Sequence, residues 1–209
     1  MYKKLDENII NEILEAGIEV FADKGLEKAN INTIARNAGV SVGVIYKYYG
    51  DKDGFFLACV RHSLELLDST LQEAVEGVKD VRECVERIVR ALIKQSREHA
   101  SYNAMYNEIT SGSCRRYAAQ LADEIEKRTA ALYTKLFETI GAVSSEDAGM
   151  FAFFFDNLLM MLQFSYSCDY YRERMKIFCG EDASDKDEKM TEMFMKFMDG
   201  VMKGEPCST

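Results

Sequence analysis

The sequence predicts an all-α protein, and three observations support that prediction. A single proline, Pro206, occurs in the 209 residues, and proline is the residue that interrupts helices most strongly. Hydrophobic residues make up 47% of the chain and charged residues 29%, which is a globular composition able to bury a core. Apolar residues recur at helical spacing in successive segments, so we expect about nine helices.

The first three helices are predicted from their caps as well as from their spacing. Gly25 follows the apolar stripe of the first helix at the position of a C-terminal cap. Asn30 and Ser41 have the side-chain chemistry of N-caps and precede the second and third helices. The three expected helices cover about residues 5–24, 31–38 and 42–49.

The remainder of the chain is also expected to be helical. Asp51 is a natural N-cap for a long fourth helix. The segment CGEDASDK (179–186) is acidic and is expected to be a solvated loop. The later helices are expected at about residues 52–77, 80–98, 102–111, 114–140, 145–177 and 187–202.

Charge is distributed unevenly along the chain. The net charge is −9, from 26 basic and 35 acidic residues, and such a balance taken alone argues against nucleic acid. Residues 1–52, however, hold 7 basic and 8 acidic side chains, and no acidic residue lies between Glu27 and Asp51. This carboxylate-free window can therefore approach phosphates without repulsion.

Two short helices joined by a tight turn lie inside this window, as in a helix-turn-helix. Ala35 and Ala38 are small enough for the two helices to cross closely, and Gly39 permits the turn. Ile45 is expected to pin the third helix to the bundle, which leaves aromatic, small and basic residues on its outer face. Such a face suits a DNA groove, while an ordinary helical corner is the alternative that the pattern leaves open.

The stretches ILEAGIEVFADKG (13–25) and INTIARNAGVSVGVIYKYYGDKDGFF (31–56) resemble the N-terminal domain of the TetR (tetracycline-repressor) family. The resemblance implies a helix-turn-helix DNA-binding domain (1–51) joined by a long helix to a helical effector-binding and dimerisation domain (52–209). It further implies a homodimeric transcription regulator, usually a repressor, that binds a pseudo-palindromic operator through the helix at 42–49 and releases it when a small molecule binds.

The resemblance also assigns DNA contacts by position. Val42 and Val44 depart from the family, where polar residues are frequent; they cannot hydrogen-bond a base edge but can contact thymine methyls. Tyr46 and Lys52 match phosphate contacts, Lys52 at the start of the fourth helix. The implied DNA-binding residues are Asn32, Thr33, Val42, Gly43, Val44, Tyr46, Lys47, Tyr48 and Lys52.

The C-terminal helices are rich in large apolar residues. The resemblance places the dimer interface in the helices at 145–177 and 187–202. Helical phase suggests an effector pocket with Glu108, Asn157 or Asp156 as its polar element, for a hydrophobic or aromatic effector; a buried carboxylate would favour a cationic one. The candidate lining residues are Tyr102, Met105, Tyr106, Ile109, Tyr133, Phe137, Phe155 and Leu159.

Enzymes and metal sites find no support in the sequence. The two histidines, His62 and His99, lie apart, and no Ser/His/Asp order, Walker loop or HExxH occurs. The six cysteines include no close pair such as zinc requires. We therefore expect no catalysis, no metal and no cofactor.

The sequence leaves two other classes of function open. A thiol-based redox sensor would need a cysteine beside cations, and Cys114, which precedes two arginines, is the candidate. A helical protein-interaction module without DNA binding is the second alternative. The most apolar run, 151–164, is short and contains Asp156, so no membrane partner is expected. The scattered cysteines and the lack of a signal peptide predict a cytoplasmic protein.

Overall fold

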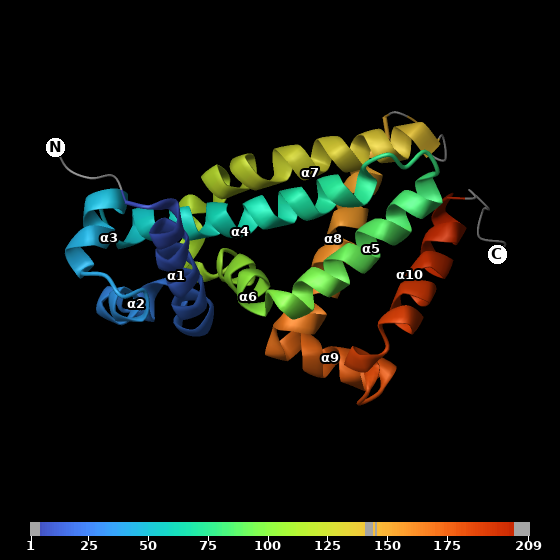
Figure 1. The fold of residues 1–209 in the computed structure, drawn as a ribbon. Coiled ribbons are helices and arrows are strands. Elements are labelled where there is room, and N and C mark those ends of the chain that lie inside the picture. The colour runs from blue at the N-terminus through green and yellow to red at the C-terminus, as the bar shows by residue number, and fades with distance from the viewer. Residues whose placement is uncertain (1–4, 141–143, 145, 203–209) are drawn as a thin grey trace. The chain divides into compact units, whose positions relative to one another are not determined.

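A computed structural model describes residues 5–140, 144 and 146–202 of the chain. Within that part it contains ten α-helices, two short 3-10 helices and no strand, which confirms the predicted all-α class (Figure 1). The helices are α1 (Glu7–Lys28), α2 (Ile31–Asn37), α3 (Val42–Tyr49), α4 (Lys52–Val75), α5 (Val81–Glu98), α6 (Ala100–Glu108), η1 (Gly112–Tyr117), α7 (Ala118–Ile140), α8 (Ala148–Ser167), α9 (Asp169–Cys179), η2 (Ala183–Asp185) and α10 (Asp187–Met202).

The chain forms two compact units that are interleaved in sequence. The first unit comprises the residues up to Asp68 together with Ser101–Ala118, and the second comprises Ser69–Ala100 and the residues from Ala119 onward. Helix α4 and the α6–η1 segment therefore contribute packing to the N-terminal helices. The division into domains at 1–51 and 52–209 remains a prediction about the protein's function.

Local side-chain chemistry sets most of the early helix ends. The Asn30 side chain accepts a hydrogen bond from the Asn32 amide at 2.8 Å, and Asp51 accepts one from the Gly54 amide at 2.7 Å, as N-caps do. Gly25 has φ 71° and ψ 169°, which interrupts α1 before a last turn that ends at Lys28. Ser41 occupies the cap position of α3, but its side chain makes no capping hydrogen bond.

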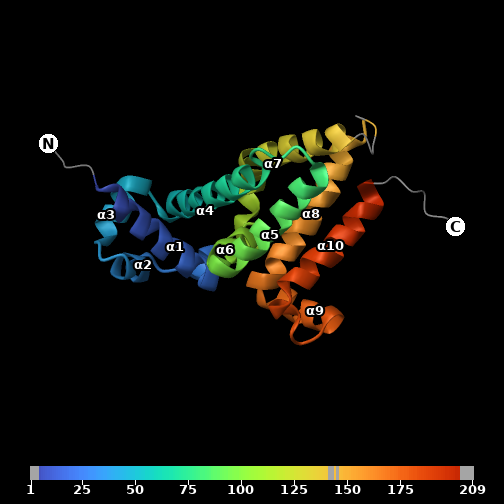
Figure 2. The ribbon, with the colours of Figure 1, turned by 45° about the vertical axis from the view of Figure 1, so that its right-hand side comes forward.

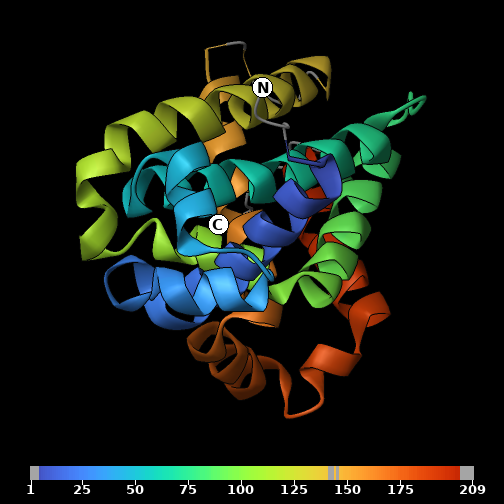
Figure 3. The same cartoon turned by 60° about the vertical axis from the view of Figure 1, so that its left-hand side comes forward.

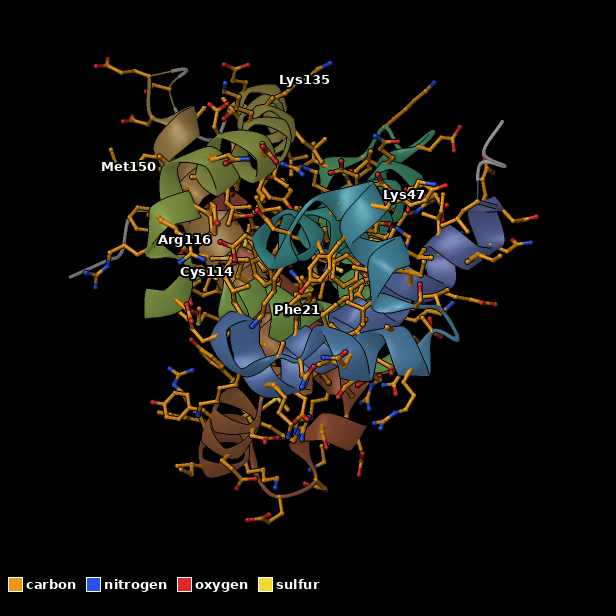
Figure 4. All side chains as sticks on the ribbon, turned by 90° about the vertical axis from the view of Figure 1, so that its left-hand side faces the viewer. Phe21, Lys47, Cys114, Arg116, Lys135 and Met150 are labelled. Carbon is orange, nitrogen blue, oxygen red and sulfur yellow. The ribbon has the colours of Figure 1, made fainter. Side chains whose placement is uncertain are left out.

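The first unit has an aromatic core between α1 and α4. The Phe21 ring (labelled in Figure 4) lies 5.8 Å from the Phe55 ring and 5.1 Å from the Phe56 ring, and all three side chains are fully buried. Gly17 allows the two helices to approach, because a Cβ there would lie 2.6 Å from the Cys59 Sγ atom. This core holds α4 against the helix that supports the helix-turn-helix.

Three helices of the second unit, α5, α8 and α10, lie beside one another (Figure 2). The α5 and α10 helices run antiparallel, and arginines of α5 pair with acids of α10. The pairs are Arg82 with Asp199, Arg90 with Glu188, and Arg97 with Asp187. They fix the register of α10 on α5.

The structure differs from the predicted segments at several points. The helix expected over 145–177 is two helices, because the chain becomes extended at Cys168, with φ −111° and ψ 130°. The helix expected over 102–111 spans Ala100–Glu108, and the one expected over 114–140 begins as the 3-10 helix η1. The segment 179–186 is not wholly solvated, since it contains η2 with the buried Ala183.

The apolar run at 151–164 has 14 residues and lies inside α8, a helix of 20 residues. The most apolar window of α8 has a mean hydropathy of 1.3, so by length and composition alone this helix could cross a membrane. However, α8 packs against α5 and α9, as core helices of the same length and composition also do.

Candidate nucleic-acid interface

The α2–turn–α3 segment is a compact helix-turn-helix. Ile34, Ala35 and Ile45 are buried at its centre. The Val40 amide donates to the Ala35 carbonyl at 2.9 Å. Gly39 has φ 65°, a conformation that glycine adopts without strain. The turn therefore holds α3 in a fixed direction relative to α2 (Figure 3).

The outer face of α3 is exposed and carries no carboxylate. The Tyr46 and Tyr48 side chains are 42% and 37% exposed, and Lys47 is exposed on the same helix (Figure 4). Gly43 is exposed too, while Val42 and Val44 are half-buried at its edges. An exposed helix with aromatic hydroxyls and a cation can enter a DNA groove and donate to phosphates.

Asn32 and Thr33 lie in the first turn of α2. Asn32 is exposed, and its side-chain Nδ2 donates to Asn30 Oδ1 at 3.2 Å. Thr33 is half-buried, and its amide donates to the Asn30 carbonyl at 3.0 Å. Asn32 is thus the more accessible of the two.

Two predicted DNA contacts also hold the protein's own structure. The Tyr48 hydroxyl accepts a hydrogen bond from the Leu5 amide at 2.8 Å. The Lys52 Nζ atom donates to the Glu27 carbonyl at 2.9 Å, at the end of α1. These bonds link residues 43 and 25 positions apart, so sequence reasoning had no local signal for them.

The residues predicted to bind an effector do not form one group. Tyr102, Met105, Tyr106 and Ile109 belong to the first compact unit, whereas Tyr133, Phe137, Phe155 and Leu159 belong to the second. In the first set, Met105 is fully buried and the Tyr102 hydroxyl donates to Glu15. In the second set, the Phe155 ring contacts the Tyr133 ring at 5.0 Å and the Phe137 ring at 5.6 Å.

The second unit has an apolar pocket of about 440 Å³ between α7, α8 and α10. Phe137 and Phe155 line it, as predicted, but Tyr133 and Leu159 are not among its lining residues. Its polar residue, Asn157, donates to the Phe153 carbonyl of its own helix at 2.7 Å. The lining residues are Phe137, Phe151, Phe154, Phe155, Asn157, Leu158, Met161, Phe197, Met198 and Val201.

Asp156 and Glu108, the other predicted polar elements, lie outside this lining. Burial raises the pKa of Asp156 to about 6, and the nearby Glu126 carboxylate adds to the effect. Glu108 belongs to the first unit, where its Oε1 accepts a hydrogen bond from the Leu26 amide at 3.0 Å. Glu108 is therefore a hydrogen-bond acceptor within the first unit, where it binds the backbone of α1.

Cys114 lacks the electrostatics of a redox sensor. Its side chain is fully buried, and burial raises the pKa of its thiol, which disfavours the reactive thiolate. The neighbouring Arg116 turns toward Asp53 instead, at 2.5 Å. Among the described residues no group of three or more His, Cys, Asp or Glu side chains could hold a metal ion. Cys207 lies outside the described residues.

The N-terminal region matches a known family of sequences. The family described as "Bacterial regulatory proteins, tetR family" matches residues 13–59. The chain is 37% identical over 79 residues to the HTH-type transcriptional regulator BetI 1 of Chromohalobacter salexigens, a match that covers 37% of this chain and 39% of that protein. It is 33% identical over 89 residues to HTH-type transcriptional regulator HbdR of Aromatoleum sp., covering 43% and 38%.

Solved structures resemble the chain over nearly its whole length. A TetR-family transcriptional regulator from Rhodococcus sp. aligns with a TM-score of 0.70 at 20% identity, covering 94% of this chain and 100% of that one. The regulator FadR from Bacillus subtilis, solved in complex with stearoyl-CoA, aligns with a TM-score of 0.67 at 15% identity and the same coverage.

The two kinds of likeness cover different parts of the molecule. The chain spans about two fifths of the length of the sequence relatives that it matches, and the family match lies at residues 13–59. At identities of 20% and below, the structural likeness shows the shared fold. The matched proteins are named as regulators and not as enzymes. Residues 13–59 therefore match the TetR family of bacterial regulatory proteins, and the fold of the described residues resembles that of solved TetR-family regulators.

Proposed function

We propose that the chain is a homodimeric, ligand-responsive transcription regulator that represses by binding a pseudo-palindromic DNA operator in the cytoplasm. The observation that carries the proposal is the exposed, carboxylate-free outer face of α3 on a rigid helix-turn-helix. That face carries no negative charge although the chain as a whole has a net charge of −9. Two copies related by a two-fold axis would enter successive major grooves about 34–36 Å apart.

The face divides into groups that position the protein and groups that discriminate bases. Tyr46, Lys47 and Lys52 would bind phosphates, with Lys52 exchanging the Glu27 carbonyl for a phosphate oxygen. Val42 and Val44 would contact thymine methyls, which predicts T at those positions of the half-site. Asn32, Thr33, Gly43 and Tyr48 complete the proposed contact surface.

Exposed aromatic residues on α8 and α10 support the homodimer. Phe153 is 63%, Phe154 is 57% and Phe197 is 58% exposed. Soluble monomers rarely expose such a cluster, and partner surfaces commonly do. We propose that these two helices pair with those of a second copy.

A hydrophobic effector is supported by the apolar pocket of about 440 Å³ in the second unit. Its volume lies within the range of about 300–1,000 Å³ usual for small-molecule sites. A structural neighbour, FadR from Bacillus subtilis, was solved with stearoyl-CoA. We propose an effector with an apolar chain or ring that contacts Phe137 and Phe155.

A DNA-binding titration with paired substitutions tests the proposal. The Lys47→Ala/Tyr48→Ala variant should bind genomic DNA fragments at least about tenfold more weakly than the parent protein, with a shallower salt dependence, because it loses a phosphate contact. Lys94→Ala serves as the control, since Lys94 is an exposed lysine on α5, in the other compact unit. If neither the parent nor the variant binds DNA, the interaction-module alternative gains and the regulator proposal fails.

A further inference from the structure

The head of the first unit, defined here as α1–α3 with the first turn of α4, is held at two places by one segment outside the helix-turn-helix. That segment is residues 101–117, which contains most of α6 and all of η1. It holds the head at the interruption of α1 and at the start of α4. Its residues lie more than 60 positions from their partners along the chain.

The first attachment is made by Glu108 at the interruption of α1. Because Gly25 leaves the helical conformation, the turn that follows begins like a new helix with free amides. Glu108 Oε1 accepts from one of them, the Leu26 amide, at 3.0 Å. A side chain at position 25 would place its Cβ 2.9 Å from the same oxygen, so glycine leaves room for the carboxylate.

Glu108 is fixed in place by its own segment. The Ser111 Oγ atom donates to Glu108 Oε1 at 3.2 Å, and the Ser113 Oγ atom donates at 2.9 Å. Three donors therefore converge on one carboxylate oxygen. Such an arrangement restricts the rotamer of the side chain and gives the attachment a defined direction.

The second attachment joins η1 to the start of α4. Asp53 Oδ2 accepts from Arg116 Nη2 at 2.5 Å and from the Tyr117 hydroxyl at 2.5 Å. The Tyr117 hydrogen bond and the Arg116 charge hold the pKa of Asp53 below its ordinary value. Arg116 also faces Glu27 of α1, with Nη1 3.9 Å from Oε1.

The two attachments flank a proposed phosphate contact. Lys52 immediately precedes Asp53, and its Nζ donates to the carbonyl of Glu27, one residue after Leu26. A displacement at either attachment would move the backbone on which Lys52 and α3 depend. DNA contacts that require two grooves to be met at once are sensitive to such displacements.

We propose that Glu108, Arg116 and Tyr117 are positioning residues for operator binding, which hold the head in the orientation that α3 and Lys52 need to meet DNA. The proposal rests on the proposed DNA-binding function. None of the three acts by touching DNA; each acts through Leu26 or Asp53. They therefore set affinity without adding a phosphate contact.

The test measures operator affinity, its salt dependence and thermal unfolding of the full chain. The probe is a DNA fragment selected by the parent protein from genomic DNA. Arg116→Ala and Tyr117→Phe should each weaken binding about three- to tenfold, as expected for losing a partly exposed charge-assisted contact. The slope of log affinity against log salt should stay unchanged, because no phosphate contact is lost.

Arg115→Ala is the matched control. Arg115 is exposed, lies in the same segment and carries the same charge, and its side chain makes no hydrogen bond or ion pair with the described residues. Its substitution should leave affinity unchanged. Glu108→Gln keeps an acceptor oxygen and should weaken binding less than Glu108→Ala. Asp53→Asn combined with Arg116→Ala should lose little more affinity than either change alone, since both remove the same contact.

Three results would overturn the proposal. In the first, Arg116→Ala flattens the salt slope while Tyr117→Phe has no effect, which would make Arg116 a direct phosphate ligand. In the second, the variants melt earlier but bind with parental affinity, which would make the contacts merely structural. In the third, Arg115→Ala weakens binding as much as Arg116→Ala. If the parent protein selects no DNA at all, the regulator function fails first.

Discussion

Asp156 is a half-buried carboxyl in the second unit whose ionisation opposes folding. Its pKa is raised from 3.8 to about 6, first by burial and then by Glu126. A raised pKa means that the folded state binds the proton more tightly than the unfolded chain does. Its contribution to stability is therefore full below about pH 3.8 and is lost as pH rises through about 6.

Asp156→Asn should consequently stabilise the protein at neutral pH. We expect the free energy of unfolding at pH 7.5 to rise by about 1–3 kcal/mol, with a difference near zero at pH 3.5. Urea unfolding of the variant and the parent protein at pH 7.5 and pH 3.5 measures this difference in the free energy of unfolding. An equal effect at both values would show that the carboxyl's charge is not the cause.

At the scale of residues, the sequence predicted contacts that are local and missed those that are distant. Asn30 and Asp51 were recognised as caps because a cap bonds an amide two or three residues away. The ties of Glu108 to Leu26 and of Arg116 to Asp53 span 82 and 63 residues. No pattern in a single chain marks such pairs.

The junction of α3 and α4 depends on a close approach of two helix ends. Gly54, in the first turn of α4, faces the carbonyl of Tyr49, the last residue of α3. A Cβ at position 54 would lie 2.3 Å from that carbonyl oxygen. The backbone carbonyl cannot rotate away as a flexible side chain would, so a larger residue must separate the helices.

Gly54→Ala should therefore destabilise the first unit by about 1–3 kcal/mol, the usual cost of overpacking. Because α3 would be displaced, DNA binding should fall more than stability alone explains. Gly43→Ala is the comparison for stability, since a Cβ there meets no atom closer than 3.7 Å. Thermal unfolding followed by circular dichroism measures the stability of both variants. A Gly54→Ala variant with the melting temperature of the parent protein would contradict the steric account.

Helix existence was predictable, whereas helix continuity was not. The periodic apolar pattern located α5 and α10 closely, and Asp80 caps α5 at the Glu83 amide. The same pattern runs through Cys168 without a proline or glycine, so it predicted one helix where α8 and α9 are two. Local propensity therefore carries no signal for this break.

At the scale of the whole molecule, pairing of two chains is a requirement of the proposed mechanism. The exposed aromatics of α8 and α10 are the surface proposed for it. Phe153→Asp introduces a charge into that surface and should convert the dimer to monomers and abolish tight operator binding.

Phe178→Asp is its control, because Phe178 is 76% exposed on α9, outside the proposed interface. Sedimentation velocity at micromolar concentration distinguishes the species. A parent protein that sediments as a monomer, or a Phe153→Asp variant that stays dimeric, would count against this surface.

The family resemblance resided in the first quarter of the sequence, and the fold of the remainder was predicted only as helical. The helix-turn-helix is recognisable because its turn, caps and small residues are all local requirements. The apolar pocket depends on how α7, α8 and α10 pack, and helical phase predicted only Phe137, Phe155 and the polar Asn157 of its lining. The candidate effector residues fall in both compact units because helical phase does not indicate which helices pack together.

Selection of duplexes from a random library by the full-length protein tests the central claim most directly. The account predicts enrichment of a pseudo-palindrome whose half-sites lie about one helical turn apart or a multiple of it, with T at the positions met by Val42 and Val44. Enrichment should disappear with the Lys47→Ala/Tyr48→Ala variant. A library that emerges unenriched from the parent protein, or a motif that the variant selects equally well, would contradict the account.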